Sequence, residues 1–171
     1  MRGQLLCLLF SFFFTIQSSS RDSVTLFIFL LDDCIICQSY TPKINELHQE
    51  FGSDVEFKGI FPNFSSKPEK IEAFKAKYGL ELEVQTDYWK TLVKKFDVSV
   101  TPEVVLYNHK SDIVLYKGRI DDEFVALGKR RRVITANDLQ NVLQKYSSGL
   151  PGPFKNTEAV GCFINQNDPF K

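Results

Sequence analysis

A buried-strand pattern that runs directly into two closely spaced cysteines constrains the fold of this sequence more than any other feature. Residues 24–31, VTLFIFLL, form a continuous apolar run of strand length with little alternation, which is typical of a strand covered on both faces. Asp32 and Asp33 end the run, and Cys34 and Cys37 follow at once in the stretch CIIC. Two cysteines at this spacing can be a redox couple, half of a metal site, or two packed small apolar side chains.

The residues after this strand predict an amphipathic helix that begins at the first cysteine. Apolar side chains recur at steps of three and four over residues 34–51, and Asp33 is a suitable N-cap. Pro42 lies inside the helix and is expected to kink it. Cys34 is then at the helix N-terminus, where free N–H groups and the helix dipole favour a thiolate. Cys37 lies one turn further on the same face, close enough to form a disulfide with Cys34 or to resolve a mixed one.

Strand and helix patterns alternate along the rest of the chain. The order strand–helix–strand–helix–strand–helix–strand–strand–helix predicts an α/β fold with a central mixed sheet and helices on both faces. We expect the later strands at 54–63, 80–87, 101–108 and 112–120, and the later helices at 68–79, 88–98 and 135–146, the last with Thr135 as N-cap. Tyr88 and Trp89 are interpreted as core aromatics.

The first twenty residues have the layout of a secretory signal peptide. One positive charge, Arg2, precedes a 12-residue apolar stretch from Leu5 to Ile16, and small polar residues follow. This stretch is shorter than the ~17 residues that a membrane span needs, and an uncleaved anchor is the alternative. We therefore expect cleavage near Ser18 to Ser20, export to a periplasmic or extracellular location, and no stable membrane span afterwards.

Composition limits the remaining options. The 171 residues and 43% apolar content suit one domain with a core, and 21 basic residues balance 21 acidic ones, so no net charge attracts nucleic acid. We predict a signal peptide at 1–20, one domain at 21–148, and a C-terminal tail at 149–171 that packs on the domain. The tail contains AVGCFI, which is apolar enough to fold back.

Loss of the signal peptide would leave three cysteines, Cys34, Cys37 and Cys162. An exported chain meets an oxidising compartment, so a redox role gains support. Cys162 could be a buried small apolar side chain, could form a disulfide with Cys34 or Cys37, or could link two chains. Two thiols cannot surround zinc, and no second CxxC or paired histidines complete a site, so we expect no metal and no cofactor.

Three motifs together resemble the thioredoxin superfamily. CIIC follows a buried strand, Pro42 lies five residues beyond the second cysteine, and VTP at residues 100–102 precedes a strand. The resemblance implies that Pro102 is a cis-proline beside the cysteine pair, a bond form that costs only ~0.5–1 kcal/mol before proline. It also implies that Thr101 and Pro102 shape the groove that docks the extended chain of a substrate.

A narrower likeness covers nearly all of the chain after the signal peptide. The segments VTPEVVLY, YKGRIDDEFVALGKRR and TEAVGCFI are similar to exported bacterial redoxin-domain proteins of the AhpC/TSA-type grouping. These relatives imply thiol chemistry. The charged stretch at 118–132 is interpreted as a surface loop with ion pairs, or alternatively as a surface that docks a partner or an anion.

Departures from the family patterns refine the expected activity. Leu31 stands where peroxiredoxins carry threonine, so efficient peroxide reduction is not expected. The buried aspartate that thioredoxins carry in the strand before the motif has no counterpart here, and Glu103 is the candidate for proton transfer to Cys37. Asp32 and Asp33 oppose a thiolate at the first cysteine, which predicts a couple more reducing than strong oxidants at about −120 mV.

The main hypothesis is a thiol–disulfide oxidoreductase in which Cys34 attacks and Cys37 resolves. Its expected partners are cysteine-containing exported proteins and a thiol reductant whose identity the sequence does not indicate. The second hypothesis is a thiol peroxidase with Cys34 as peroxidatic residue and Cys37 or Cys162 as resolving residue. The third is a copper-binding assembly factor that uses Cys34, Cys37 and His109, because copper chaperones of the thioredoxin fold use two cysteines and a distant histidine.

Overall fold

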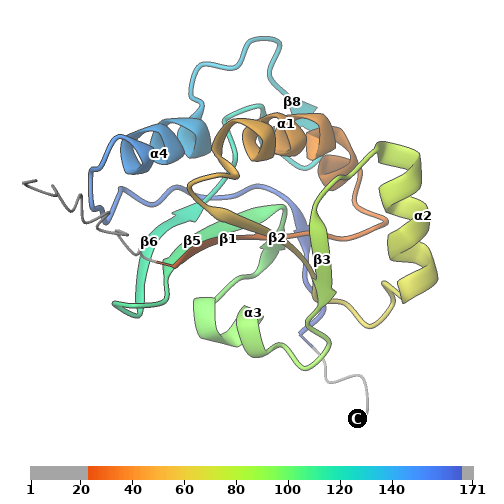
Figure 1. Cartoon of the computed structure of the whole chain (residues 1–171). Coiled ribbons are helices and arrows are strands. Elements are labelled where there is room, and N and C mark those ends of the chain that lie inside the picture. The colour runs from red at the N-terminus through yellow and green to blue at the C-terminus, as the bar shows by residue number, and fades with distance from the viewer. Residues whose placement is uncertain (1–22, 167–171) are drawn as a thin grey trace, which may run out of the picture.

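A five-stranded mixed sheet forms the centre of the computed structural model, which describes residues 23–166 (Figure 1). The strand order is β3-β2-β1-β5-β6. β1 pairs in parallel with β2 and antiparallel with β5, β2 pairs in parallel with β3, and β5 and β6 form an antiparallel hairpin. The strands are β1 (Val24–Phe29), β2 (Glu56–Phe61), β3 (Glu83–Thr86), β5 (Glu103–Asn108) and β6 (Ile113–Gly118).

The central strand β1 is buried on both faces, as its sequence predicts. Leu26 and Ile28 belong to the larger apolar cluster, which also contains the buried side chains of three helices: α1 (Ile35–Phe51), α2 (Pro68–Tyr78) and α4 (Asp138–Ser147). Phe27 and Phe29 belong to a second cluster on the other face, with the side chains of α3 (Thr91–Phe96). Figure 1 shows α1 and α4 on one face of the sheet and α3 on the other. The predicted α/β architecture is therefore confirmed.

Two predicted helix N-caps are wrong, one by a single residue and the other by two residues. Cys34, not Asp33, is the N-cap of α1, because the chain is still extended at Cys34 and Asp33 lies one residue too early. Thr135 is not the N-cap of α4, which begins after Asn137. The reason is that Thr135 donates its hydroxyl and backbone hydrogen bonds to Asp122 instead.

The segment before α3 also differs from its prediction. Trp89 is not a core aromatic: its side chain is 64% exposed. Tyr88 is partly buried, and its hydroxyl donates to the carbonyl of Ser66 at 2.6 Å. Asp87 is the buried residue of this turn, because its carboxylate accepts hydrogen bonds from three backbone N–H groups at the start of α3.

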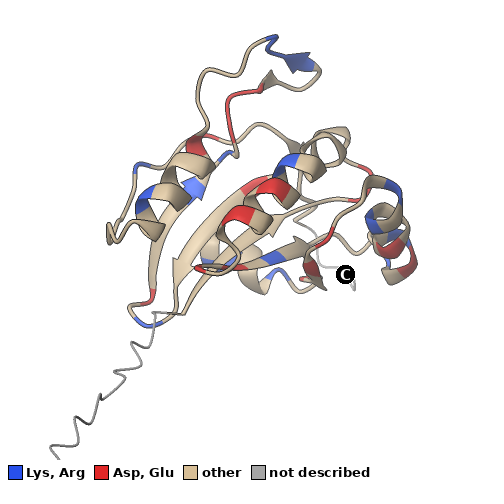
Figure 2. Cartoon of the chain, turned by 45° about the horizontal axis from the view of Figure 1, so that its top comes forward, with Lys and Arg blue, Asp and Glu red and all other residues tan. Residues whose placement is uncertain are grey.

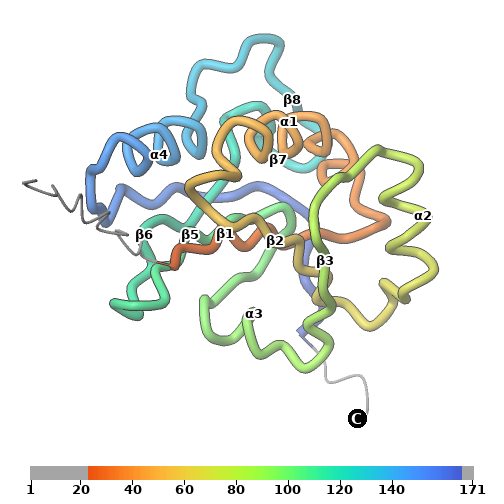
Figure 3. Tube along the Cα trace, viewed as in Figure 1, coloured from red at the N-terminus to blue at the C-terminus, as the bar shows by residue number. Residues whose placement is uncertain are grey.

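Four short strands complete the structure. β7 (Phe124–Ala126) and β8 (Lys129–Arg130) form a small hairpin, and β4 (Val100–Thr101) pairs antiparallel with β9 (Cys162–Phe163). β9 belongs to the C-terminal segment, the blue tube that crosses the molecule after α4 in Figure 3. None of the helices within residues 23–166 is long and apolar enough to span a membrane. The predicted signal peptide lies outside the described residues.

Candidate active site

The two cysteines of CIIC lie where the central strand ends and the first helix begins. After β1, the chain turns through Asp32 and Asp33, and the backbone N–H of Cys34 donates to the carbonyl of Leu31 at 3.3 Å. The carbonyl of Cys34 then accepts the first helical hydrogen bond, from Gln38. The strand thereby fixes Cys34 at the N-terminal end of α1, as the sequence predicts.

Cys34 is joined to Cys162 by a disulfide in the structure. Their Cα atoms lie 6.1 Å apart across 128 residues of sequence. Of the alternatives open for Cys162, an intramolecular disulfide with Cys34 is the one that forms. Cys34 is only 1% exposed, whereas Cys162 is partly exposed.

Cys37 is the free thiol of the site, and it is fully buried. Burial raises the pKa of its thiol to about 12, against weaker opposite effects of hydrogen bonds from the Leu31 backbone and the Thr101 side chain. The negative charge of Asp33 raises this pKa further. With a pKa this high, Cys37 is a neutral thiol at physiological pH.

Thr101, the residue before Pro102, lies against all three cysteines. The peptide bond between Thr101 and Pro102 is cis. The Thr101 carbonyl oxygen is 3.4 Å from Cys34 Sγ, and its hydroxyl donates to the Cys162 carbonyl at 3.4 Å. The same side chain is a hydrogen-bonding neighbour of Cys37. Thr101 is therefore a neighbour that the three cysteines share.

Glu103 lies on the face of the sheet opposite to α1. It pairs with Phe29, and its neighbours along β5, Val105 and Tyr107, pack in the α3 cluster. Its carboxylate is 3.9 Å from Lys117 Nζ, and burial raises its pKa. Because Cys37 belongs to the cluster on the α1 face, this arrangement gives Glu103 no direct route for the predicted proton transfer.

The C-terminal tail, residues 149–166 of the described chain, forms backbone and side-chain hydrogen bonds with β6 and Arg119 on the N-terminal side of Cys162. The N–H groups of Phe154 and Thr157 donate to carbonyls of β6 at 2.7 and 3.1 Å. The Thr157 hydroxyl lies 2.7 Å from the hydroxyl of Tyr116 and accepts from the Arg119 N–H at 3.1 Å. Gly118 leaves the space that Thr157 fills, since a Cβ at residue 118 would lie 2.2 Å from the Thr157 hydroxyl oxygen.

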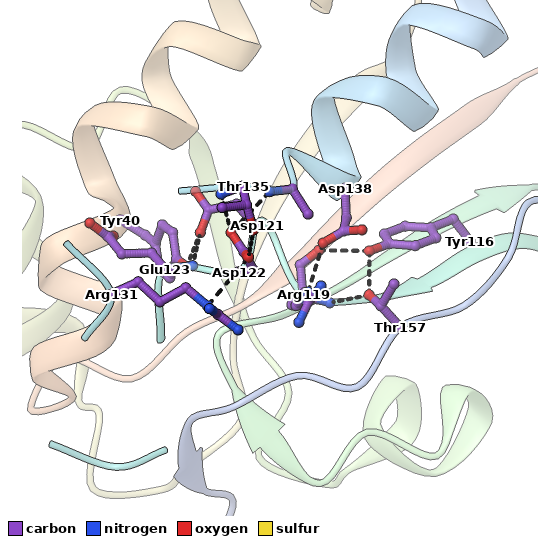
Figure 4. A network of polar contacts seen from close by, with 11 residues as sticks. Tyr40, Tyr116, Arg119, Asp121, Asp122, Glu123, Arg131, Thr135, Asp138 and Thr157 are labelled. Atoms are coloured by element: carbon purple, nitrogen blue, oxygen red, sulfur yellow. Dashed lines mark hydrogen bonds and ion pairs between the residues drawn. The ribbon is translucent and has the colours of Figure 1, made fainter. Parts of the chain in front are cut away.

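A buried polar network stands beside these hydrogen bonds (Figure 4). Arg119 forms an ion pair with Asp138 at the start of α4, at 2.7 Å. The hydroxyl of Tyr40, on α1, donates to the buried carboxylate of Asp121, which also accepts the Glu123 N–H at 2.9 Å. The network connects α1 and α4 to the loop after β6.

The predicted surface loop at 118–132 is a hairpin with its acidic residues inside and its basic residues outside. Asp121, Asp122 and Glu123 are buried, and Arg130 and Arg131 reach back to Glu123 and Asp122 at 2.5 and 3.3 Å. Figure 2 shows the basic residues of β8 at the tip of the hairpin, away from the rest of the molecule. The ion pairs agree with the surface-loop interpretation, and the docking interpretation stays a prediction.

The structure does not assemble the proposed copper site. The N–H of His109 donates to the carbonyl of Ser23, and its ring Nε2 lies 2.9 Å from the Thr25 hydroxyl. These contacts place His109 at the start of β1, whereas Cys34 and Cys37 follow the end of that strand. Within residues 23–166 no cluster of three or more His, Cys, Asp or Glu side chains could hold a metal ion.

Sequence reasoning missed two residues that hold the tail beside the site. Gly161, just before Cys162, packs against the Thr101 backbone, and Ile164, two residues after Cys162, is buried in the α3 cluster. The apolar residues of AVGCFI indicate folding back, but a partner 128 residues away in the sequence leaves no local pattern. The site can therefore exchange disulfides among three sulfurs, one pair of them bonded and one thiol adjacent.

Comparison with known proteins supports the architecture. No family model and no curated protein matches the sequence. Among solved structures, an uncharacterized conserved protein from Geobacillus kaustophilus is 20% identical with a TM-score of 0.71, covering 85% of this chain and 78% of that one. A hypothetical protein from Sinorhizobium meliloti is also 20% identical, with a TM-score of 0.66 over 84% and 80%.

A third solved structure carries a descriptive name. The putative thioredoxin from Neisseria meningitidis is 20% identical, with a TM-score of 0.53 over 75% of each chain. At these identities the likeness concerns the fold, and the AhpC/TSA-type grouping stays a prediction. The structural likeness, the mixed sheet and the CIIC turn at the end of β1 together establish that this chain has a thioredoxin-like fold.

Proposed function

We propose that this protein is a thiol–disulfide oxidoreductase that acts on cysteine-containing exported proteins. The observation that carries the proposal is the clustering of three cysteines at Thr101: Cys34 and Cys162 bonded to each other, and the thiol of Cys37 buried beside them. Disulfide exchange requires a thiolate, a sulfur that it can attack, and a second thiol that releases the product. The chain supplies all three and needs no cofactor for this chemistry.

In the reducing direction, the thiolate of Cys34 attacks one sulfur of a substrate disulfide. A bond forms between Cys34 and that sulfur, and the other substrate sulfur leaves and takes a proton. A second thiol of the protein then attacks Cys34 Sγ and releases the first substrate sulfur. The substrate gains two electrons, the protein keeps a disulfide, and an external thiol reductant returns it to the dithiol form.

We propose a different resolving residue from the one that sequence reasoning assigns. Sequence reasoning assigns this step to Cys37, but Cys34 is bonded to Cys162. The raised pKa of Cys37 makes its thiolate scarce at neutral pH, whereas Cys162 is partly exposed. We propose that Cys162 is the first to resolve the mixed disulfide and that Cys37 exchanges with the resulting bond more slowly.

The test compares insulin reduction by four full-length proteins with a thiol reductant: the wild type and the Cys34→Ser, Cys37→Ser and Cys162→Ser variants. We expect activity to vanish in Cys34→Ser and to fall more in Cys162→Ser than in Cys37→Ser. Trapping uses Cys37→Ser/Cys162→Ser, because either remaining thiol would otherwise release the partner. If insulin reduction is the same with and without Cys34, and nothing is trapped on it, the proposed activity is wrong.

A reducing couple and an exported location complete the proposal. Asp33 acts against a negative charge at this site, since it raises the pKa of Cys37. We expect the protein to equilibrate with glutathione buffers at a potential well below the about −120 mV of a strong oxidant. Export is tested by the N-terminus of the mature protein, expected to follow residues 18–20.

A further inference from the structure

The strand β9 holds the tail cysteine as an extended chain beside the cis-proline turn. β9 runs antiparallel to β4, with Cys162 opposite Thr101 and Phe163 opposite Val100. The N–H of Ile164 donates to the Ser99 carbonyl at 3.0 Å. Main-chain pairing of this kind gives affinity without regard to sequence, while the pockets at alternate side chains give specificity.

The position before the cysteine accepts only glycine. A Cβ at Gly161 would lie 2.0 Å from the carbonyl oxygen of Thr101 and 2.5 Å from its carbonyl carbon. Both are backbone atoms at the strand that carries the site, so no side-chain movement relieves the contact. Any chain that lies in the same place must have a residue without Cβ there, or must shift away from Thr101.

The two positions after the cysteine differ from each other. Phe163 is 75% exposed, so its side chain contributes little to the fit. Ile164 is 4% exposed and lies in the apolar cluster of Val93, Phe96 and Val98. The position next to the cysteine is therefore unrestricted, and the one after it requires an aliphatic side chain.

We propose that residues 161–164 are an internal substrate, and that the external substrate is an extended segment with the pattern Gly-Cys-X-aliphatic. The inference rests on the proposed function, whose substrate class it specifies. The tail must leave β4 before such a segment docks. Release begins when the Cys37 thiolate attacks Cys34 Sγ, which forms the Cys34–Cys37 bond and expels the Cys162 thiolate, which takes a proton; no net oxidation occurs.

The first experiment measures this internal exchange in the full-length oxidised protein. After acid quenching, peptide mapping gives the ratio of Cys34–Cys162 to Cys34–Cys37 disulfide at equilibrium. Gly161→Ala adds a clash with backbone and Ile164→Asp buries a charge, so each should lower the ratio about tenfold or more. Phe163→Ala, at the exposed position between them, is the matched control and should leave the ratio unchanged. Equal ratios in all four proteins would overturn the inference.

The second experiment presents the pattern from outside. The full-length Cys37→Ser/Cys162→Ser variant is equilibrated with glutathione disulfides of four peptides, EAVGCFIN, EAVACFIN, EAVGCFDN and EAVGCAIN. The Cys34 thiolate attacks the peptide sulfur, a Cys34–peptide disulfide forms, and glutathione leaves as a thiol. We expect the first and last peptides to accumulate on Cys34 about tenfold more than the other two, as peptide mapping of the Cys34 disulfide would show.

The outcomes separate the inference from the function on which it rests. If all four peptides accumulate equally, the chemistry stands and the Gly-Cys-X-aliphatic rule is wrong. If neither the peptides nor plain glutathione disulfide reacts with Cys34, the proposed function itself is wrong. The unbonded tail of the Cys37→Ser/Cys162→Ser variant competes equally with every peptide, so it does not affect their ranking.

Discussion

At the scale of single residues, environment gives three chemically identical side chains three different roles. Cys34 is bonded and nearly inaccessible, Cys162 is bonded and partly exposed, and Cys37 is a buried thiol. Thiolate fraction and access together set the rate of disulfide exchange. The order in which the sulfurs react therefore follows from their surroundings.

The raised pKa of Cys37 predicts resistance to alkylation in the oxidised protein. A pKa of about 12 instead of 9.0 lowers the thiolate fraction at pH 8 about a thousandfold, and burial slows the reagent further. We expect iodoacetamide to leave Cys37 unmodified at pH 8 and to label it on unfolding in urea without reductant. Mass spectrometry of the peptide that contains Cys37 reads this out. Rapid labelling of the folded, oxidised protein would contradict it.

The hydrogen bond from Tyr40 to the buried carboxylate of Asp121 should stabilise the folded protein. Tyr40→Phe removes the hydroxyl that donates to Asp121, a carboxylate that is 2% exposed. We expect the free energy of unfolding to fall by about 1–3 kcal/mol, because hydrogen bonds to buried charged groups lie in that range. Urea denaturation measures the change. Tyr78→Phe is the matched control, since the Tyr78 hydroxyl has no hydrogen bond within residues 23–166; an equal loss in both variants would contradict this account.

Sequence reasoning located two of the three cysteines in the site and left the partner of the third open, for a physical reason. Cys34 and Cys37 follow from local pattern, because a strand end and a helix start are local features. The partner of Cys162 depends on Cα atoms that come within 6.1 Å only after the whole sheet has formed. Glu103 follows Pro102 in sequence, but alternation along β5 turns it to the other face of the sheet, and its role in proton transfer stays a prediction.

At the scale of elements, the long buried strand and the periodic helices were predictable, whereas the two-residue ladders were not. β1 and α1 agree with their predicted ranges within two residues, because eight apolar residues and five helical turns give strong signals. β4 and β9 have two residues each, too few for any period, and their pairing depends on where the tail lies. That pairing is what brings Cys162 to Cys34.

The absence of a side chain at Gly118 should be required for Thr157 and the tail to pack on β6. Gly118→Ala places a Cβ 2.2 Å from the Thr157 hydroxyl oxygen and 2.5 Å from the Thr157 carbonyl oxygen. We expect the tail to detach from β6, so that trypsin cleaves after the exposed Lys155 several-fold faster in the oxidised protein, as local opening exposes the backbone. Timed proteolysis with mass spectrometry measures this rate.

Gly128→Ala is the matched control for this prediction. Gly128 has a φ of +72° and no atom within 4 Å of an added Cβ, so the substitution strains the β7–β8 turn without touching the tail. Its cleavage after Lys155 should equal that of the wild type. Unchanged cleavage in Gly118→Ala would show that Thr157 does not fasten the tail.

At the scale of the whole molecule, the disulfide closes nearly the entire described chain into one loop. It joins the turn after the first strand to the last strand over 128 residues of sequence, with most residues of both apolar clusters in between. A cross-link over so long a loop removes much conformational freedom from the unfolded chain. Redox state should therefore change the stability of the protein as well as its chemistry.

The measurable consequence is a difference in stability that depends on reductant. Cys162→Ala leaves Cys34 without its partner across the 128-residue separation, so the free energy of unfolding should fall by up to about 5 kcal/mol relative to the oxidised wild type. Urea denaturation with and without dithiothreitol measures it. With reductant, the wild type should lose most of this advantage and approach the variant.

Cys37→Ala is the control, because it keeps the Cys34–Cys162 bond and should respond to reductant as the wild type does. This comparison separates the effect of the cross-link from the loss of a sulfur atom. If Cys162→Ala unfolds at the same urea concentration as the oxidised wild type, the Cys34–Cys162 bond does not hold the folded protein together in solution.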